Sequence, residues 1–394
     1  MVTARRALAL LLAALLPACG LLIGINDLEA VPASGADSGR NETGADDGTV
    51  GDAGTEDASD AGIDVGDDAA RRCDAAADPE NCGRCGHSCL GGQCRDGQCE
   101  ATALANGQGP VSAVALSATH VYFTAINTNL VARVPKDGGA VEPLATAPHV
   151  AVPKRIVVTD THVYWANGDL PGWVSRCPLA GCGAAPEVFS QNGAEATGLT
   201  VDGSHAYWTD SNGDQIRRRP LDGGAEQTVV DVAGGRPMAL AGGAPNAFWI
   251  VDFSASVFRS ESDGGKTLVG KTGTSGREVA LDDTWVYWAV ANDVGDPGSL
   301  ARAPRDGGVS QVLGPAFGHP RALTIDGDRV HWTAWTELAD GGLVDGGIHS
   351  CPTVGCTTGR TTHASGEDRP RGLAIDTAAY YWGTGNGVKK LARP

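Results

Sequence analysis

Cysteine is the residue type whose spacing in this chain points most directly to chemistry. Six of the 11 cysteines lie within residues 73–99, among mostly small and polar residues: Cys73, Cys82, Cys85, Cys89, Cys94 and Cys99. A segment with so few apolar side chains needs cross-links to fold, so we expect three disulfides, whose pairing the spacing leaves open. Zinc is the alternative, because Cys82, Cys85 and His87 have ligand-like spacing. The clustering indicates an oxidising compartment, which favours disulfides.

Two further cysteine pairs have a Cys-x4-Cys spacing, in which a short turn separates the two residues. They are Cys177 with Cys182 and Cys351 with Cys356. Because a hairpin brings the two ends of such a turn together, we expect one local disulfide in each. All ten cysteines other than Cys19 then pair as five disulfides, and none is left as a redox-active thiol.

Cys19 stands apart because it follows a targeting segment. Arg5 and Arg6 precede a ten-residue apolar stretch at 7–16, too short to span a bilayer, and small residues follow. The junction Leu16-Pro17-Ala18-Cys19 resembles the lipobox of bacterial lipoproteins, which implies cleavage after residue 18, acylation of Cys19 and stable attachment to a membrane. Gly20 in place of Asp implies an outer-membrane or surface location. The alternative is an ordinary signal peptide with a chance cysteine.

Four basic residues share one position in a repeated pattern. Lys154, Arg277, Arg321 and Arg371 each lie eleven residues before the second member of a recurrent aromatic pair. If the repeats form a ring, these side chains surround one mouth of its channel and attract an anion such as a carboxylated glycan or an acidic peptide. Trp335 lies on a long loop on the same face. The alternative is that each Arg pairs with a nearby acid, Glu278, Glu367 or Asp368.

No linear motif of an enzyme is present. A nucleophile elbow, an HExxH helix, a phosphate-binding loop and a dinucleotide fingerprint are all missing, so we assign no catalytic residue, cofactor or metal ligand. A lyase or hydrolase with its site in the axial channel stays open as the alternative function. The net charge of −17 makes a nucleic-acid partner improbable.

The elements that would position these residues are seven copies of one unit. Their anchor is a pair of aromatic-type residues: Tyr122-Phe123, Tyr164-Trp165, Tyr207-Trp208, Phe248-Trp249, Tyr287-Trp288, His331-Trp332 and Tyr381-Trp382. The second members are 42, 43, 41, 39, 44 and 50 residues apart, the length of a four-stranded propeller blade. A short apolar stretch precedes each pair, as expected of a buried innermost strand.

The repeats also predict how the ring closes. The seventh unit ends one strand short, and residues 101–110 resemble the outer-strand segment 363–370 of the sixth unit. We therefore expect a seven-bladed β-propeller whose last blade receives an N-terminal strand, which removes two open sheet edges. A basic residue recurs in the third strand, at Arg133, Arg176, Arg218, Arg259, Arg302 and Lys390. It either contacts a ligand or, more in keeping with its repetition, has a structural role.

Composition agrees with this organisation. The 56 glycines and 21 prolines of the 394 residues favour many short strands and tight turns over helices. Residues 21–70 hold 13 acidic residues and one basic residue, Arg40, which predicts a disordered acidic linker. The expected organisation is a lipoprotein signal peptide at 1–19, a linker at 20–70, a disulfide-rich module at 71–99 and an all-β propeller at 100–394.

Two resemblances extend this interpretation. The segment from Gly198 through Tyr207-Trp208-Thr209-Asp210 to Gly224 resembles a YWTD repeat. With seven units, the whole repeat region resembles bacterial NHL-like propellers. The cysteine-rich run resembles a small module of exported myxobacterial proteins. These resemblances imply a protein of the bacterial cell envelope, anchored to the membrane by lipid, whose propeller binds a protein or carbohydrate without catalysis.

Overall fold

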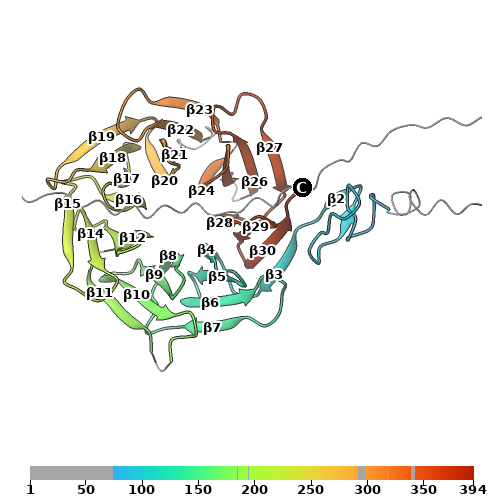
Figure 1. The fold of residues 1–394 in the computed structure, drawn as a ribbon, viewed down its shortest axis with the longest axis horizontal. Coiled ribbons are helices and arrows are strands. Elements are labelled where there is room, and N and C mark those ends of the chain that lie inside the picture. Colours follow the sequence, from blue (N-terminus) through green and yellow to red (C-terminus); the bar gives the residue numbers. More distant parts are fainter. Residues whose placement is uncertain (1–73, 184, 194, 292–297, 317, 339–341) are drawn as a thin grey trace, which may run out of the picture. The chain divides into compact units, whose positions relative to one another are not determined.

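The structure, a computed structural model, is all-β. It describes residues 74–394 except 184, 194, 292–297, 317 and 339–341. Twenty-eight of its strands form seven four-stranded antiparallel sheets arranged around a central axis as the blades of a propeller (Figure 1). Residues 1–73 lie outside the described part of the chain. The predictions for the signal peptide, Cys19, the acidic linker and Cys73 concern these residues. No helix in the described part of the chain is long and apolar enough to cross a membrane.

The strands occupy equivalent places in every blade. The innermost strands are β4 (Val111–Leu116), β8 (Pro153–Val158), β12 (Ala196–Val201), β16 (Pro237–Gly242), β20 (Ser275–Leu281), β24 (His319–Asp326) and β28 (Arg371–Ile375). The second strands are β5 (His120–Ala125), β9 (His162–Asn167), β13 (His205–Asp210), β17 (Ala247–Val251), β21 (Trp285–Ala291), β25 (Arg329–Glu337) and β29 (Ala379–Gly383). The third strands are β6 (Leu130–Pro135), β10 (Gly172–Pro178), β14 (Gln215–Pro220), β18 (Ser256–Ser260), β22 (Ser299–Pro304), β26 (Leu343–Pro352) and β30 (Gly387–Ala392). The outer strands are β7 (Glu142–Ala145), β11 (Glu187–Gly193), β15 (Gln227–Asp231), β19 (Lys266–Lys271), β23 (Gln311–Pro315), β27 (Thr361–Ser365) and β3 (Thr102–Asn106).

The predicted aromatic anchors form the core between blades. The second member of each pair is at most 1% exposed. Each one lies directly across from a branched aliphatic residue of the innermost strand, as Trp165 does from Ile156 and Trp382 from Leu373. A β-bulge interrupts the innermost strand just before that aliphatic residue in every blade. Burial of these large rings between sheets is what holds neighbouring blades together.

The ring closes as the repeat predicts. The N-terminal strand β3 pairs antiparallel with β30, the last strand of the chain, with Thr102 opposite Lys390 and Asn106 opposite Gly387. Leu104 is buried in the cluster that also contains Val388 and Phe123. The seventh blade is thus built from both ends of the domain, and β3 covers the edge that β30 would otherwise expose.

In five of the seven blades the recurrent basic residue donates a hydrogen bond to the next blade, which supports its structural interpretation. Arg176 Nη1 donates to Leu221 O at 2.6 Å, and Arg302 Nη1 donates to Thr353 O at 2.9 Å. Arg133, Arg259 and Lys390 donate to Leu179 O, Arg305 O and Lys136 O in the same way. Each acceptor lies near the hairpin between the third and outer strands of the neighbouring blade. The side chain therefore satisfies a turn carbonyl of that blade instead of facing a ligand.

The cysteine-rich module at 74–99 contains disulfides, as predicted. Cys82 is joined to Cys94 and Cys89 to Cys99, and Cys85 is also disulfide-bonded. The two hairpin pairs, Cys177–Cys182 and Cys351–Cys356, are joined as well. A short ladder between β1 (Cys94–Arg95) and β2 (Gln98–Cys99) completes the module. Because Cys82 is committed to a disulfide, it does not offer the thiolate that the zinc alternative requires.

Candidate functional site

The first candidate site is a cationic cluster at the start of three consecutive innermost strands. Arg277 lies in β20, Arg321 in β24 and Arg371 at the first position of β28. The guanidinium carbons of Arg321 and Arg371 lie 4.4 Å and 5.6 Å from the ring centroid of Trp335. The prediction that Trp335 lies on a loop is wrong, because β25 extends through Glu337 and pairs with β26. We call Arg277, His319, Arg321, Trp335 and Arg371 the basic mouth. Blades five, six and seven each contribute to it.

The pKa shifts within the basic mouth agree with a gathering of positive charge there. Burial lowers the pKa of His319, and the charges of Arg321 and Arg277 lower it further. Burial likewise lowers the pKa of Arg371, with a contribution from Arg369. Each shift shows a cationic form made less favourable by loss of water and by like charge. An anion at the mouth would relieve both effects.

The acids that the sequence offered as partners for these arginines are engaged elsewhere. Glu278 pairs with Arg155 and Glu367 with Lys389. Asp368 lies 3.6 Å from Arg369. Within the described part of the chain, the side chains of Arg277 and Arg371 form no hydrogen bond or ion pair. Local neutralisation by Glu278, Glu367 or Asp368 therefore does not account for Arg277 and Arg371.

Several buried nitrogen atoms at the basic mouth have no acceptor among the described residues. They are Arg277 Nε, His319 Nε2 and Trp335 Nε1. Trp335 is 4% exposed, so water does not readily compensate for a missing partner. Such orphan groups are uncommon in folded proteins and call for a physical explanation. A ligand rich in acceptor oxygens would supply one.

Lys154, the fourth basic residue expected at this level, belongs to blade two. Its side-chain carbons pack beside Gly168, where an added Cβ would lie 2.6 Å from Lys154 Cγ. No contact joins Lys154 to the basic mouth in the described residues. The three arginines that are consecutive in the repeat thus make up the cationic cluster of blades five to seven, and Lys154 lies apart from it.

A second candidate site lies in the axial channel. Its residues lie on the innermost strands, each one position after the residue that aligns with Arg277, Arg321 and Arg371. Five blades carry alanine or glycine at this position: Ala113, Gly198, Ala239, Ala322 and Gly372. The innermost strands approach closely here, since a Cβ on Gly372 would lie 2.8 Å from Val114 N. Longer side chains must extend into the channel. Blade two has Arg155 and blade five has Glu278 at this position.

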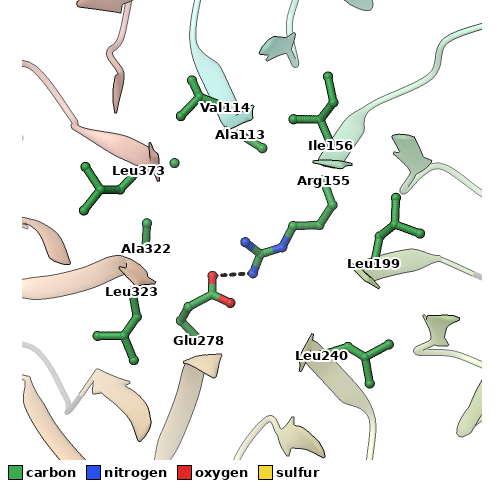
Figure 2. A pocket seen from close by; sticks show the side chains of 11 residues that line it. Ala113, Val114, Arg155, Ile156, Leu199, Leu240, Glu278, Ala322, Leu323 and Leu373 are labelled. Atoms are coloured by element: carbon green, nitrogen blue, oxygen red, sulfur yellow. Dashed lines mark hydrogen bonds and ion pairs between the residues drawn. The ribbon is translucent and has the colours of Figure 1, made fainter. Parts of the chain in front are cut away.

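Arg155 and Glu278 meet across the channel. Figure 2 shows the two side chains pointing toward each other inside a ring of aliphatic residues. Arg155 Nη2 donates a hydrogen bond to Glu278 Oε2. Glu278 is 5% exposed, and burial raises its pKa although the charge of Arg155 opposes that shift. Sequence reasoning missed this pair because it compared the neighbouring position. The same comparison made one residue later would have found two opposite charges among five small residues.

The channel pocket offers few groups for acid–base chemistry among the described residues. Acid–base catalysis by a pair of side chains needs two carboxylate or imidazole groups at close range. The residues that line the channel pocket include one carboxylate, Glu278, and its partner is an arginine. The remaining lining residues are Gly372 and aliphatic side chains, so the described channel offers no second acid or base.

Comparisons with known proteins show the fold alone. No family model matches the chain. Virginiamycin B lyase from Staphylococcus aureus is 15% identical over 75% of this chain and 99% of that one, with a TM-score of 0.60. The WD40 domain of Neurospora crassa Pan2 is 7% identical over 73% and 90%, with a TM-score of 0.56. A chain of a nidogen–laminin complex is 20% identical over 59% and 89%, with a TM-score of 0.45.

Proposed function

We propose that the propeller is a recognition module that binds an anionic ligand at the basic mouth. The observation that carries this proposal is the gathering of Arg277, Arg321 and Arg371 around Trp335 and His319, with Arg277 and Arg371 lacking acidic partners in the described chain. Guanidinium groups bind carboxylates in a planar, two-point geometry. A carboxylated glycan or an acidic peptide has the chemistry that this surface would recognise.

The test measures binding of two anionic probes, tetragalacturonate and an octaglutamate peptide, to the full-length protein. We expect Arg371→Ala and Arg277→Ala each to weaken binding of one probe by a factor of about 10 to 150, because a hydrogen bond to a charged group contributes about 1.5–3 kcal/mol. Binding should also weaken with added salt. Arg95→Ala is the matched control, because Arg95 lies in the cysteine-rich module and pairs with Glu100 on the surface. Equal affinity in all four proteins, or no binding of either probe, would refute the proposal.

We further propose that the protein is a lipoprotein of the bacterial cell envelope, attached through an acylated Cys19 at the outer membrane or cell surface. The supporting observation is the lipobox-like sequence at 16–19, after a positively charged start and a ten-residue apolar stretch. The disulfides of the described domain agree with an oxidising compartment. Expression of Cys19→Ser in a bacterial host tests it: the variant should lose incorporation of labelled palmitate and leave the membrane fraction. Retention of both properties would contradict lipid anchoring.

A further inference from the structure

The Arg155–Glu278 pair belongs to the channel and is separate from the basic mouth. The propeller closes with alanine or glycine at the equivalent position in five blades, so ring formation itself does not require charge there. A structural role shared by the repeats would recur, as the third-strand arginine does. Two opposite charges in near-opposite blades therefore call for another explanation, because removing both from water costs free energy.

The pair leaves hydrogen-bonding capacity unused. Among the described residues, Arg155 donates one hydrogen bond to Glu278, from Nη2 to Oε2. No other acceptor in that part of the chain contacts the Arg155 guanidinium. Glu278 Oε1 receives a long bond of 3.3 Å from Val279 N. The Arg155 side chain is 27% exposed and that of Glu278 is 7% exposed, so the guanidinium can be reached from solvent. One donor edge of Arg155 thus remains open to a ligand, and Glu278 Oε1, which accepts only the long bond from Val279 N, can accept a second hydrogen bond.

The cavity around the pair has room for a small molecule. Its volume is 120 Å³, enough for several water-sized groups. Aliphatic side chains such as Ile156, Leu199 and Leu323 form its walls. In such surroundings a ligand with net charge would leave one charge uncompensated. A neutral site made of one cation and one anion instead matches a neutral ligand that carries one of each.

We propose that the axial channel binds a small zwitterion of the α-amino-acid type, whose carboxylate pairs with Arg155 and whose ammonium group pairs with Glu278. The ligand's dipole then lies antiparallel to that of the ion pair, so four charges alternate in sign. The small cavity restricts the side chain to the size of glycine or alanine. No covalent step is involved, and the site is independent of the anion site proposed at the basic mouth.

The experiment uses full-length protein and four probes of related chemistry: glycine, L-alanine, acetate and methylammonium. The last two carry one half of the zwitterion each. Isothermal titration and thermal shift should show saturable binding of glycine or alanine, with at least tenfold weaker binding of acetate and of methylammonium. Equal binding of acetate would overturn the proposal in favour of a simple anion site. Absence of glycine and alanine binding would overturn it in favour of a structural ion pair.

Two variants make the result specific to the channel. The double variant Arg155→Met/Glu278→Met removes both charges together, because a single replacement would leave one buried charge unpaired. It should fold and lose the saturable binding of glycine, and glycine binding that persists in it would contradict the site. Arg371→Ala should bind glycine like the wild type while losing affinity for anionic probes. Loss of either ligand can thus be assigned to one proposal without affecting the other.

Discussion

Arg277 and Glu278 are adjacent in the sequence and yet belong to different sites. Arg277 contributes to the basic mouth, where its charge reaches His319. Glu278 contributes to the channel, where it meets Arg155 from blade two. The bulge in β20 lies between Gly276 and Glu278, so it falls where Arg277 is inserted. A single residue's position relative to this bulge decides which of the two sites its side chain serves.

Aspartates in the turns between the innermost and second strands have a structural role. Asp202 and Asp282 each accept backbone N–H bonds from the residues two and three positions later. Burial would raise the pKa of Asp282, but the hydroxyl of Tyr287 and the two backbone N–H groups hold that pKa below its usual range. Repetition of an acid in these units therefore has a structural cause.

Blade six has a histidine, His331, where five other blades have tyrosine and blade four has Phe248. Burial lowers the pKa of His331 and of the stacked His363 to about 4 each. The unfolded chain binds these protons near pH 6.5, whereas the folded chain binds them near pH 4. Their contribution to stability is therefore complete above about pH 6.5 and is lost as the pH falls toward 4.

The corresponding prediction compares His331→Phe with the wild type. Between pH 7.5 and pH 5 the melting temperature of the variant should fall less than that of the wild type, because one of the two proton-binding groups is absent. His149→Gln is the control, since His149 is exposed on a loop. Thermal unfolding followed by circular dichroism at the two pH values tests this prediction. A melting temperature that falls as much in His331→Phe as in the wild type would contradict the assignment.

At the scale of elements, the third-strand arginine connects neighbouring sheets, but blades three and six lack this connection. Arg218 bonds Gln227 within its own blade, and in the described chain it donates to no neighbouring blade. Blade six has Ser350 at this position, and Arg329 from the second strand bonds Ser350 Oγ instead. The connection from blade seven to blade six is made by Arg393, which pairs with Asp326.

Two equivalent arginines give a matched test of this connection. Arg302 and Arg218 make the same local bond at 3.0 Å, to Gln311 and Gln227, but Arg302 also reaches Thr353 O and stacks on Trp285. Arg302→Met should lower the free energy of unfolding by about 1.5–3 kcal/mol. Arg218→Met should lower the free energy of unfolding by a clearly smaller amount. Urea unfolding measures both values, and equal losses would show that the bond between blades contributes nothing.

At the scale of the whole molecule, closure depends on β3, a five-residue strand far from its partner in sequence. Leu104 and Ala105 face the core, whereas Ala103 faces solvent. Around the same junction, Lys136 of blade one pairs with Asp376 of blade seven at 2.9 Å. Contacts from both ends of the chain thus hold blades one and seven together.

The test of closure places the same charge on the two faces of β3. Leu104→Asp should lower the free energy of unfolding by about 3 kcal/mol or more, because a core leucine is lost and a charge is buried in its place. Ala103→Asp should have little effect, since its side chain is exposed. Hydrogen exchange should rise in β30 in the first variant alone. Slow exchange of β30 in Leu104→Asp would show that the ring does not depend on this strand.

The fold class, the number of blades, the closing strand and the two hairpin disulfides could all be predicted from the amino-acid sequence. These features follow from local patterns that each unit repeats: aromatic anchors, glycine-rich turns and the Cys-x4-Cys spacing. Repetition makes such signals reliable, because seven copies of one unit must bury the same faces against each other.

The contacts between charged side chains of different blades could not be predicted in this way. Arg155 and Glu278 are 123 residues apart, and they come together because the ring brings blades two and five to one axis. The same closure places Arg277, Arg321 and Arg371 on one side and leaves Lys154 beside Gly168. Periodicity fixes the strand on which a residue lies, but the direction of a long side chain depends on bulges and on neighbours distant in sequence.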